Sequence, residues 1–265
     1  MRPLGASWGE IAARIAAAEV TLLCFDYDGT LTPIVRKPEE AVLPEEIGEL
    51  LAELSGKARY RVAVISGRSL TEVRRLVGIE EIIYAGNHGL ELAGPSQSFV
   101  HPGAGKARGI IGTIANRLRR ELKEIAEAQV EDKSLSVSVH FRRVNAGDLD
   151  RVLEIIRETV RTPLEKGRIR LSRGKKVVEI RPPVDWDKGK IVVWLRSEIE
   201  KISGIKPVLV VYTGDDRTDE DAFAAIGDSG ITIRVGKEKL HSRAQYRLDD
   251  TDQVRDFMLR LIGIP

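Results

Sequence analysis

The residues best suited to chemistry are two aspartates, Asp26 and Asp28, which follow directly after the apolar run 20–24. One carboxylate of such a pair can attack the phosphorus of a phosphate monoester, while the second protonates the leaving oxygen and then activates water. We therefore predict that Asp26 is the nucleophile and Asp28 the acid and base of a phosphoryl-transfer site. A single Asp-x-Asp pair is common in solvated turns, so this prediction depends on whether other segments supply the partners that the chemistry needs.

A metal site is expected because two carboxylates would repel a phosphate dianion unless a cation lay beside them. Mg²⁺ is the expected ion, since it prefers oxygen ligands and commonly accompanies phosphate groups. Asp215 is the natural third carboxylate, and Asp216 and Asp219 are close enough in the chain to join or orient it. The predicted metal ligands are Asp26, Asp28, Asp215 and Asp216.

Two further residues are assigned to the phosphoryl group. Ser66 can donate a hydrogen bond to it, and Lys188, expected at the start of a helix, can neutralise the charge that nucleophile and phosphate share. Together with Asp26 and Asp28, they form the predicted catalytic set. Arg68 suits the binding of phosphate or sugar hydroxyl groups, although an arginine at this place could simply cap a helix.

These residues are placed by four short apolar runs rich in β-branched side chains. The runs are Val20–Cys24, Val62–Ile65, Ile82–Ala85 and Val208–Tyr212. Such runs are typical of parallel strands covered on both faces, and ligands bind beyond the carboxyl ends of such strands. Helical patterns lie between the runs, at 44–54, 70–77 and 190–202. The sequence therefore predicts an α/β core with its site loops on one edge of the sheet.

The middle of the chain has a different pattern. It predicts a long helix at 106–128, a strand at 135–142, a second helix at 149–160 and a hairpin formed by 168–171 and 175–181. This α+β pattern predicts a lid domain at 104–183, inserted into a core made of 1–103 and 184–265. Its hinges are expected at 103–105 and 182–183, where glycines and prolines stand.

Composition favours a globular protein of one or two domains. The chain has 265 residues, of which 42% are apolar and 31% charged. No apolar run reaches the roughly 18 residues of a membrane span, and charges interrupt the alanine-rich stretch 11–18, so we expect a cytoplasmic protein. The single cysteine, Cys24, excludes a disulfide framework and is expected in the core.

Charge is unevenly distributed, although the net charge is only +2. The segment 104–183 contains 19 Lys or Arg residues against 11 Asp or Glu residues. A basic segment of this kind could bind nucleic acid or attract a small anionic substrate such as a phosphate ester. Its single aromatic residue, Phe141, argues against stacking on single strands. We expect neither nucleic acid nor a membrane as a partner.

Seven segments carry a resemblance to a known family. In their usual order, Asp26–Leu31, Ser66–Arg68, Lys188–Gly189 and Gly214–Glu220 resemble the four motifs of the haloacid dehalogenase-like phosphatases. More narrowly, Gly86–Glu91, Glu131–Lys133 and Gly174–Pro182 resemble the trehalose-6-phosphate phosphatases. The resemblance covers nearly the whole chain. It implies a Rossmann-like, doubly wound core with an inserted α+β cap, dependence on Mg²⁺, and hydrolysis of trehalose 6-phosphate through an aspartyl-phosphate. A functional link to a trehalose-6-phosphate synthase is also expected.

The resemblance also implies that cap residues grip the sugar while the core handles the phosphate. The predicted substrate-binding residues are Arg68, Asn87, His88, Glu131, Lys133, Lys175 and Glu179. The family pattern does not decide between the adjacent lysines 175 and 176, but strand alternation places Lys175 on the same face as Glu179. His88 could instead be a turn residue bonded to its own backbone, and Glu131 and Lys133 could form an exposed ion pair of little consequence.

Other functions remain open at this point. The same mechanism could serve sucrose phosphate or a mannosyl- or glucosyl-glycerate phosphate, and a sugar-phosphate sensor could bind without turnover. A complete set of Asp26, Asp28, Lys188 and Asp215 argues against the sensor, because a binder does not need an acid and base. The chain lacks a phosphate-binding Gly-x-x-x-x-Gly-Lys-Ser/Thr loop, and its four histidines show no metal-ligand spacing.

Overall fold

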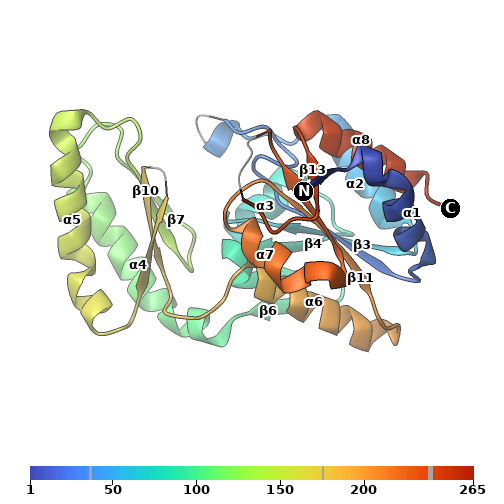
Figure 1. The fold of residues 1–265 in the computed structure, drawn as a ribbon. Helices are drawn as coiled ribbons and strands as arrows, with labels where there is room; N and C mark the ends of the chain where they lie inside the picture. The colour runs from blue at the N-terminus through green and yellow to red at the C-terminus, as the bar shows by residue number, and fades with distance from the viewer. Residues whose placement is uncertain (36–37, 175, 238–240) are drawn as a thin grey trace. The chain divides into compact units, whose positions relative to one another are not determined.

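The computed structural model describes residues 1–35, 38–174, 176–237 and 241–265 (Figure 1). It contains two compact units, one formed by 1–99 and 186–265 and the other by 100–185. The sequence placed the boundaries of the inserted unit at 104 and 183. Within the described residues, no helix has the length and apolarity that crossing a lipid bilayer requires.

The first unit is built on a nine-stranded sheet in the order β1-β13-β12-β11-β2-β3-β4-β5-β6. Its strands are β1 Arg2–Pro3, β2 Thr21–Phe25, β3 Tyr60–Ile65, β4 Ile83–Gly86, β5 Glu91–Ala93, β6 Ser98–Val100, β11 Leu209–Gly214, β12 Ile231–Val235 and β13 Tyr246–Leu248. The four predicted apolar runs form β2, β3, β4 and β11, which are adjacent and parallel. The loops that follow them therefore lie along one edge of the sheet, as the sequence predicted.

Helices cover both faces of this sheet. Figure 1 shows α1, α2 and α8 on one side of the strands and α6 and α7 on the other. The helices are α1 Trp8–Ala17, α2 Glu45–Gly56, α3 Leu70–Val77, α6 Lys188–Ser203, α7 Asp219–Ile226 and α8 Thr251–Ile262, with short 3₁₀ turns at η1 Gly5–Ser7, η2 Pro38–Glu40, η3 Asn87–Gly89 and η4 Gly227–Ser229. In β2, Leu23 and Phe25 pack on the first side, whereas Leu22 and Cys24 pack on the second. The predicted α/β class and the buried position of Cys24 are confirmed.

The second unit has a four-stranded antiparallel sheet in the order β7-β8-β10-β9. Its elements are α4 Pro102–Glu121, β7 Gln129–Asp132, β8 Val137–His140, α5 Ala146–Glu165, β9 Arg170–Gly174 and β10 Val177–Arg181. On β8, Val137 and Val139 pack into the same core as α4 and α5, while Ser138 and His140 alternate to the opposite face. The sheet thus has an apolar face toward its helices and a polar face away from them.

The structure of this unit differs from the sequence predictions in three places. The residues 103–105, predicted as a hinge, lie in the first turn of α4, because Pro102 begins that helix and the His101 ring accepts a hydrogen bond from the Gly103 N–H at 3.2 Å. The helix predicted over 106–128 ends at Glu121. The residues 129–132, for which the sequence predicted no strand, form β7.

Candidate active site

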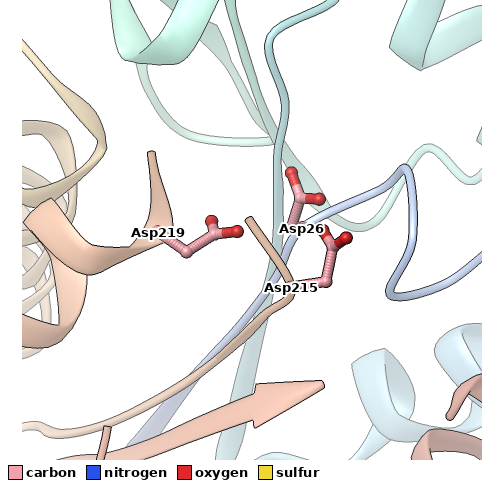
Figure 2. A group of neighbouring side chains, drawn as sticks. All are labelled: Asp26, Asp215 and Asp219. Atoms are coloured by element: carbon pink, nitrogen blue, oxygen red, sulfur yellow. The ribbon is translucent and has the colours of Figure 1, made fainter. Parts of the chain in front are cut away.

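Three carboxylates lie close together beyond the carboxyl ends of two central strands of the core sheet. Asp26 follows β2 and Asp215 follows β11, and these strands are neighbours whose last paired residues are Phe25 and Thr213. Asp219 is the first residue of α7. One oxygen from each of the three carboxylates lies within 4.8 Å of the others, and Figure 2 shows the three groups side by side.

Two glycines allow these carboxylates to approach so closely. Gly29 has φ +83°, a left-handed conformation that strains any residue with a Cβ, and a Cβ there would collide with the Asp215 carboxylate. A Cβ on Gly214 would likewise collide with the side chain of Asp219. Packing therefore requires both glycines, and at Gly29 the backbone conformation requires one as well.

Lys188 connects two of the carboxylates. Its ammonium donates to Asp26 Oδ1 at 2.6 Å and to Asp219 Oδ1 at 2.8 Å, and its side chain is only 3% exposed. Lys188 begins α6, and Gly189 lets this helix lie against the α7 backbone at Asp221, which brings the lysine to Asp219. Burial opposes the charged ammonium, but Asp219 and Asp26 raise the pKa of Lys188 above its usual value, so it stays charged.

The site carries more negative charge than this ammonium balances. Burial, together with the carboxylates of Asp219 and Asp216, raises the pKa of Asp215 to about 7. Burial also raises the pKa of Asp26, against the opposing effect of Lys188. Asp215 Oδ1 is buried and has no hydrogen-bond partner among the described residues. Crowded carboxylate oxygens, one of them orphaned, fit a hard divalent cation such as Mg²⁺.

The carboxylates of the two other predicted metal ligands make hydrogen bonds outside this group of three. The Asp28 carboxylate is held by Arg68, with Nε to Oδ2 at 2.8 Å and Nη2 to Oδ1 at 2.7 Å. The Asp216 carboxylate accepts hydrogen bonds from the N–H and the hydroxyl of Thr218 at 2.6 and 2.7 Å. Burial acts to raise the pKa of Asp216, but Lys188 and these hydrogen bonds hold it below its usual range. In the described part of the chain, Asp219 completes the three-carboxylate group instead.

Ser66 and His88 lie together beyond the ends of β3 and β4. The buried Ser66 hydroxyl accepts from the Arg68 N–H at 3.1 Å, and the Ser66 carbonyl accepts from the His88 N–H at 2.9 Å. The His88 ring packs on Gly67, where a Cβ would lie 2.6 Å from the ring carbon Cε1. The two loops therefore fix each other, with the imidazole beside the backbone of the Ser66 loop.

Asn87 and His88 both have left-handed backbone conformations, at φ +50° and +56°. Two consecutive non-glycine residues in this region are costly and need strong local support. Asn87 supplies some of it, because its fully buried amide donates to Glu91 Oε1 at 2.7 Å. The same Glu91 oxygen accepts from the Leu70 N–H at 2.9 Å, which ties the turn to the start of α3. The Asn87 side chain thus faces the interior of the unit.

The predicted sugar-binding residues share the polar face of the cap sheet. Lys133 Nζ lies 3.8 Å from Glu131 Oε2 and 3.7 Å from Glu179 Oε1. Its side chain is 10% exposed, so this is not the solvated ion pair of the alternative interpretation. The Ser136 hydroxyl donates to Glu179 at 3.2 Å, and His140 Nε2 lies 2.9 Å from Glu131 Oε2. Lys175, the remaining cap residue of the prediction, lies outside the described residues.

Sequence reasoning missed three residues that hold this machinery in place. Tyr212 donates its hydroxyl proton to Asp219 Oδ1 at 2.8 Å, Glu72 accepts from Arg68 Nη1, and His140 contacts Glu131. For Glu72 a signal was present, since it stands four residues after Arg68 at the start of a helical pattern. Tyr212 and His140 are strand residues whose partners come from other elements, which no local spacing reveals.

Comparison with known proteins gives the family. Residues 24–252 match the family described as trehalose-phosphatase. The protein called trehalose-phosphate phosphatase B of Arabidopsis thaliana is 33% identical over 258 residues, covering 93% of this chain and 67% of that protein. The trehalose-phosphate phosphatase of Mycobacterium tuberculosis (strain ATCC 25177 / H37Ra) is 39% identical over 241 residues, covering 89% of this chain and 60% of that protein.

Solved structures agree with these relatives. A trehalose-6-phosphate phosphatase related protein is 26% identical with a TM-score of 0.78, over 92% of this chain and 98% of that one. A haloacid dehalogenase-like hydrolase from Bacteroides thetaiotaomicron, 16% identical with a TM-score of 0.60 over 91% of this chain and 99% of that one, shares the fold. The chain belongs to the trehalose-phosphatase family, as the resemblance in its sequence predicted.

Proposed function

We propose that this protein is a Mg²⁺-dependent phosphatase that hydrolyses trehalose 6-phosphate to trehalose and phosphate. The observation that carries the proposal is the group of the buried Asp26 and Asp219 and the partly buried Asp215 with Lys188, in a chain that belongs to this family. The resident ion would be held by the three carboxylates, and it would supply positive charge beside the phosphoryl oxygens. Asp28 and Asp216, which the sequence also predicted as metal ligands, remain predicted ligands of the same ion.

In the first step Asp26 attacks phosphorus while the phosphorus–oxygen bond to the sugar breaks. Lys188 holds one Asp26 oxygen at 2.6 Å, which directs the other oxygen toward the substrate. Asp28 gives a proton to the departing sugar oxygen, so trehalose leaves as the neutral alcohol. In the second step Asp28 takes a proton from water, water attacks phosphorus, and the bond to Asp26 breaks with release of phosphate. Ser66 and His88 are assigned to the phosphoryl group.

We assign sugar recognition to the polar face of the cap sheet. Glu131 and Glu179 offer carboxylate acceptors and Lys133 offers an ammonium donor, a combination that suits neighbouring sugar hydroxyl groups. Lys175 keeps its place in this proposal through the family resemblance of 174–182, with strand alternation favouring it over Lys176. We further propose that the protein acts in the cytoplasm, where a synthase that makes trehalose 6-phosphate would supply the substrate.

The decisive experiment is phosphate release from trehalose 6-phosphate with Mg²⁺, and again after the metal is removed by a chelator. The assay is repeated with sucrose phosphate and glucosyl- and mannosyl-glycerate phosphates. We expect the highest kcat/KM for trehalose 6-phosphate and loss of turnover without metal. A higher kcat/KM for another ester would reassign the substrate, and tight binding without hydrolysis would indicate a sensor.

A further inference from the structure

Arg68 is buried between three side chains. Its Nε and Nη2 donate to the two oxygens of Asp28, and its Nη1 donates to Glu72 Oε1. The guanidinium carbon lies 5.4 Å from the centre of the Tyr27 ring. The residue is 6% exposed. Three of its N–H donors are thus directed at protein carboxylates, a use that the sequence did not predict.

Arg68 binds the Asp28 carboxylate in a bidentate manner, with one nitrogen on each oxygen. A planar guanidinium that binds both oxygens fixes the direction of a carboxylate as well as its position, which a lysine ammonium cannot do. The Asp28 side chain is 45% exposed, so its neighbours leave it considerable freedom apart from this contact. The orientation of the Asp28 carboxylate is therefore set mainly by Arg68.

Arg68 itself is held rigidly. Its N–H donates to the Ser66 hydroxyl at 3.1 Å, and its carbonyl accepts from the Asn87 N–H at 2.7 Å. Glu72 lies in the first turn of α3, a helix whose N-cap Ser69 accepts from the Glu72 N–H at 3.2 Å. The guanidinium is thus anchored through a capped helix and a fixed loop, and Asp28 is the partner that it orients.

We propose that Arg68 is a positioning residue for Asp28, that it aims the carboxylate that moves protons in the reaction, and that Glu72 holds Arg68 for this purpose. The inference deepens the proposed function and rests on it. A general acid must lie within hydrogen-bond reach of the leaving oxygen, and a displacement of about 1 Å can cost on the order of 10²-fold in rate. Misorientation of the Asp28 carboxylate should therefore slow the reaction most for the ester whose leaving group is the strongest base.

The test varies the basicity of the leaving group. Wild type, Arg68→Lys and Glu72→Gln are assayed with Mg²⁺ on trehalose 6-phosphate, phenyl phosphate and p-nitrophenyl phosphate. For Arg68→Lys we expect kcat/KM to fall roughly 10²-fold with trehalose 6-phosphate, clearly less with phenyl phosphate, and less than about threefold with p-nitrophenyl phosphate, whose leaving group departs without a proton. Glu72→Gln should rank the three esters in the same order, with falls in kcat/KM that are roughly tenfold smaller.

The matched control is Arg74→Lys, an exposed arginine on the same helix, which should leave every kcat/KM unchanged. Equal losses with both aryl esters would show that Arg68 binds the phosphoryl group, and a loss with the sugar ester alone would show a sugar contact. Either result overturns the inference. If Arg68→Lys does not fold, the same comparison of esters is made with Glu72→Gln. If wild type releases phosphate only from the aryl esters, the trehalose assignment fails while the aryl comparison still decides the role of Arg68. Turnover of no ester would overturn both.

Discussion

The core site and the polar face of the cap sheet use the same residue types in opposite ways. In the core, Asp26, Asp215 and Asp219 crowd around one lysine, Lys188, on loops and a helix start beyond the strand ends. In the cap, charged residues alternate along the strands, and Lys133 stands between two glutamates at 3.7 and 3.8 Å. The core is left with excess negative charge, which demands a cation and suits reaction at phosphorus. The cap has paired donors and acceptors, which suit neutral hydroxyl groups.

The largest expected effect lies in the core. Asp26→Asn removes the nucleophile while keeping the size of the side chain, so we expect phosphate release to fall by roughly 10⁴-fold or more on every ester. The measurement is phosphate release with Mg²⁺, and an unchanged thermal midpoint shows that the variant is folded. Turnover at the wild-type rate would refute the assignment of Asp26 and, with it, the contrast between a reactive core and a recognising cap.

A second core prediction concerns backbone shape. Gly29→Ala places a Cβ against the Asp215 carboxylate at φ +83°, so it should displace one side of the three-carboxylate group and lower turnover by about 10²-fold. The thermal shift that Mg²⁺ produces in the wild type should shrink as well.

Gly78→Ala is the matched control for this variant. Gly78 has φ +72°, and no atom lies within 4 Å of the position that a Cβ would take there, so the change costs about 1 kcal/mol of stability and leaves turnover intact. If both variants lost activity equally, backbone strain alone would explain the loss, and the contact with Asp215 would not matter.

The core site was largely predictable because strand ends mark it. Asp26, Ser66 and Asp215 each follow an apolar run, and parallel strands bring such ends to one edge. The directions of the side chains were not predictable. Asp28 turns to Arg68, 40 residues away in the chain, and this choice depends on a tertiary contact.

The cap was less predictable for two physical reasons. β7 is an edge strand in which only Val130 packs on the core, so its sequence lacks the apolar alternation that marks a strand. The sequence predicted a longer helix before β7 because Leu122 and Ile125 keep helical spacing. Both are buried, although α4 ends at Glu121. Leu122 caps α4, with its N–H bonded to the Leu118 carbonyl, and Ile125 is buried in the same core beyond the helix end, so the apolar spacing continues past the helix.

A cap variant should change recognition and leave the chemistry intact. Glu179→Gln weakens a charged acceptor beside Lys133 and Ser136, so we expect KM for trehalose 6-phosphate to rise at least about tenfold. The kcat/KM for p-nitrophenyl phosphate should stay within about twofold. Glu165→Gln, the same change at an exposed residue at the end of α5, serves as the control and should change neither value. Equal losses on both esters would place Glu179 in the reaction and abolish the distinction between the two regions.

The smallest expected effect tests whether the cap face is organised beyond its charged residues. His140 Nε2 lies 2.9 Å from Glu131 Oε2, so His140→Ala removes a donor that orients this carboxylate. One such hydrogen bond contributes about 0.5–1.5 kcal/mol, and KM for trehalose 6-phosphate should therefore rise roughly three- to tenfold with kcat preserved. His140→Gln keeps an N–H donor near the position of Nε2 and should restore most of the affinity. If His140→Gln behaved like His140→Ala, the ring would act through packing alone. Only the core site would then use hydrogen bonds to orient its carboxylates.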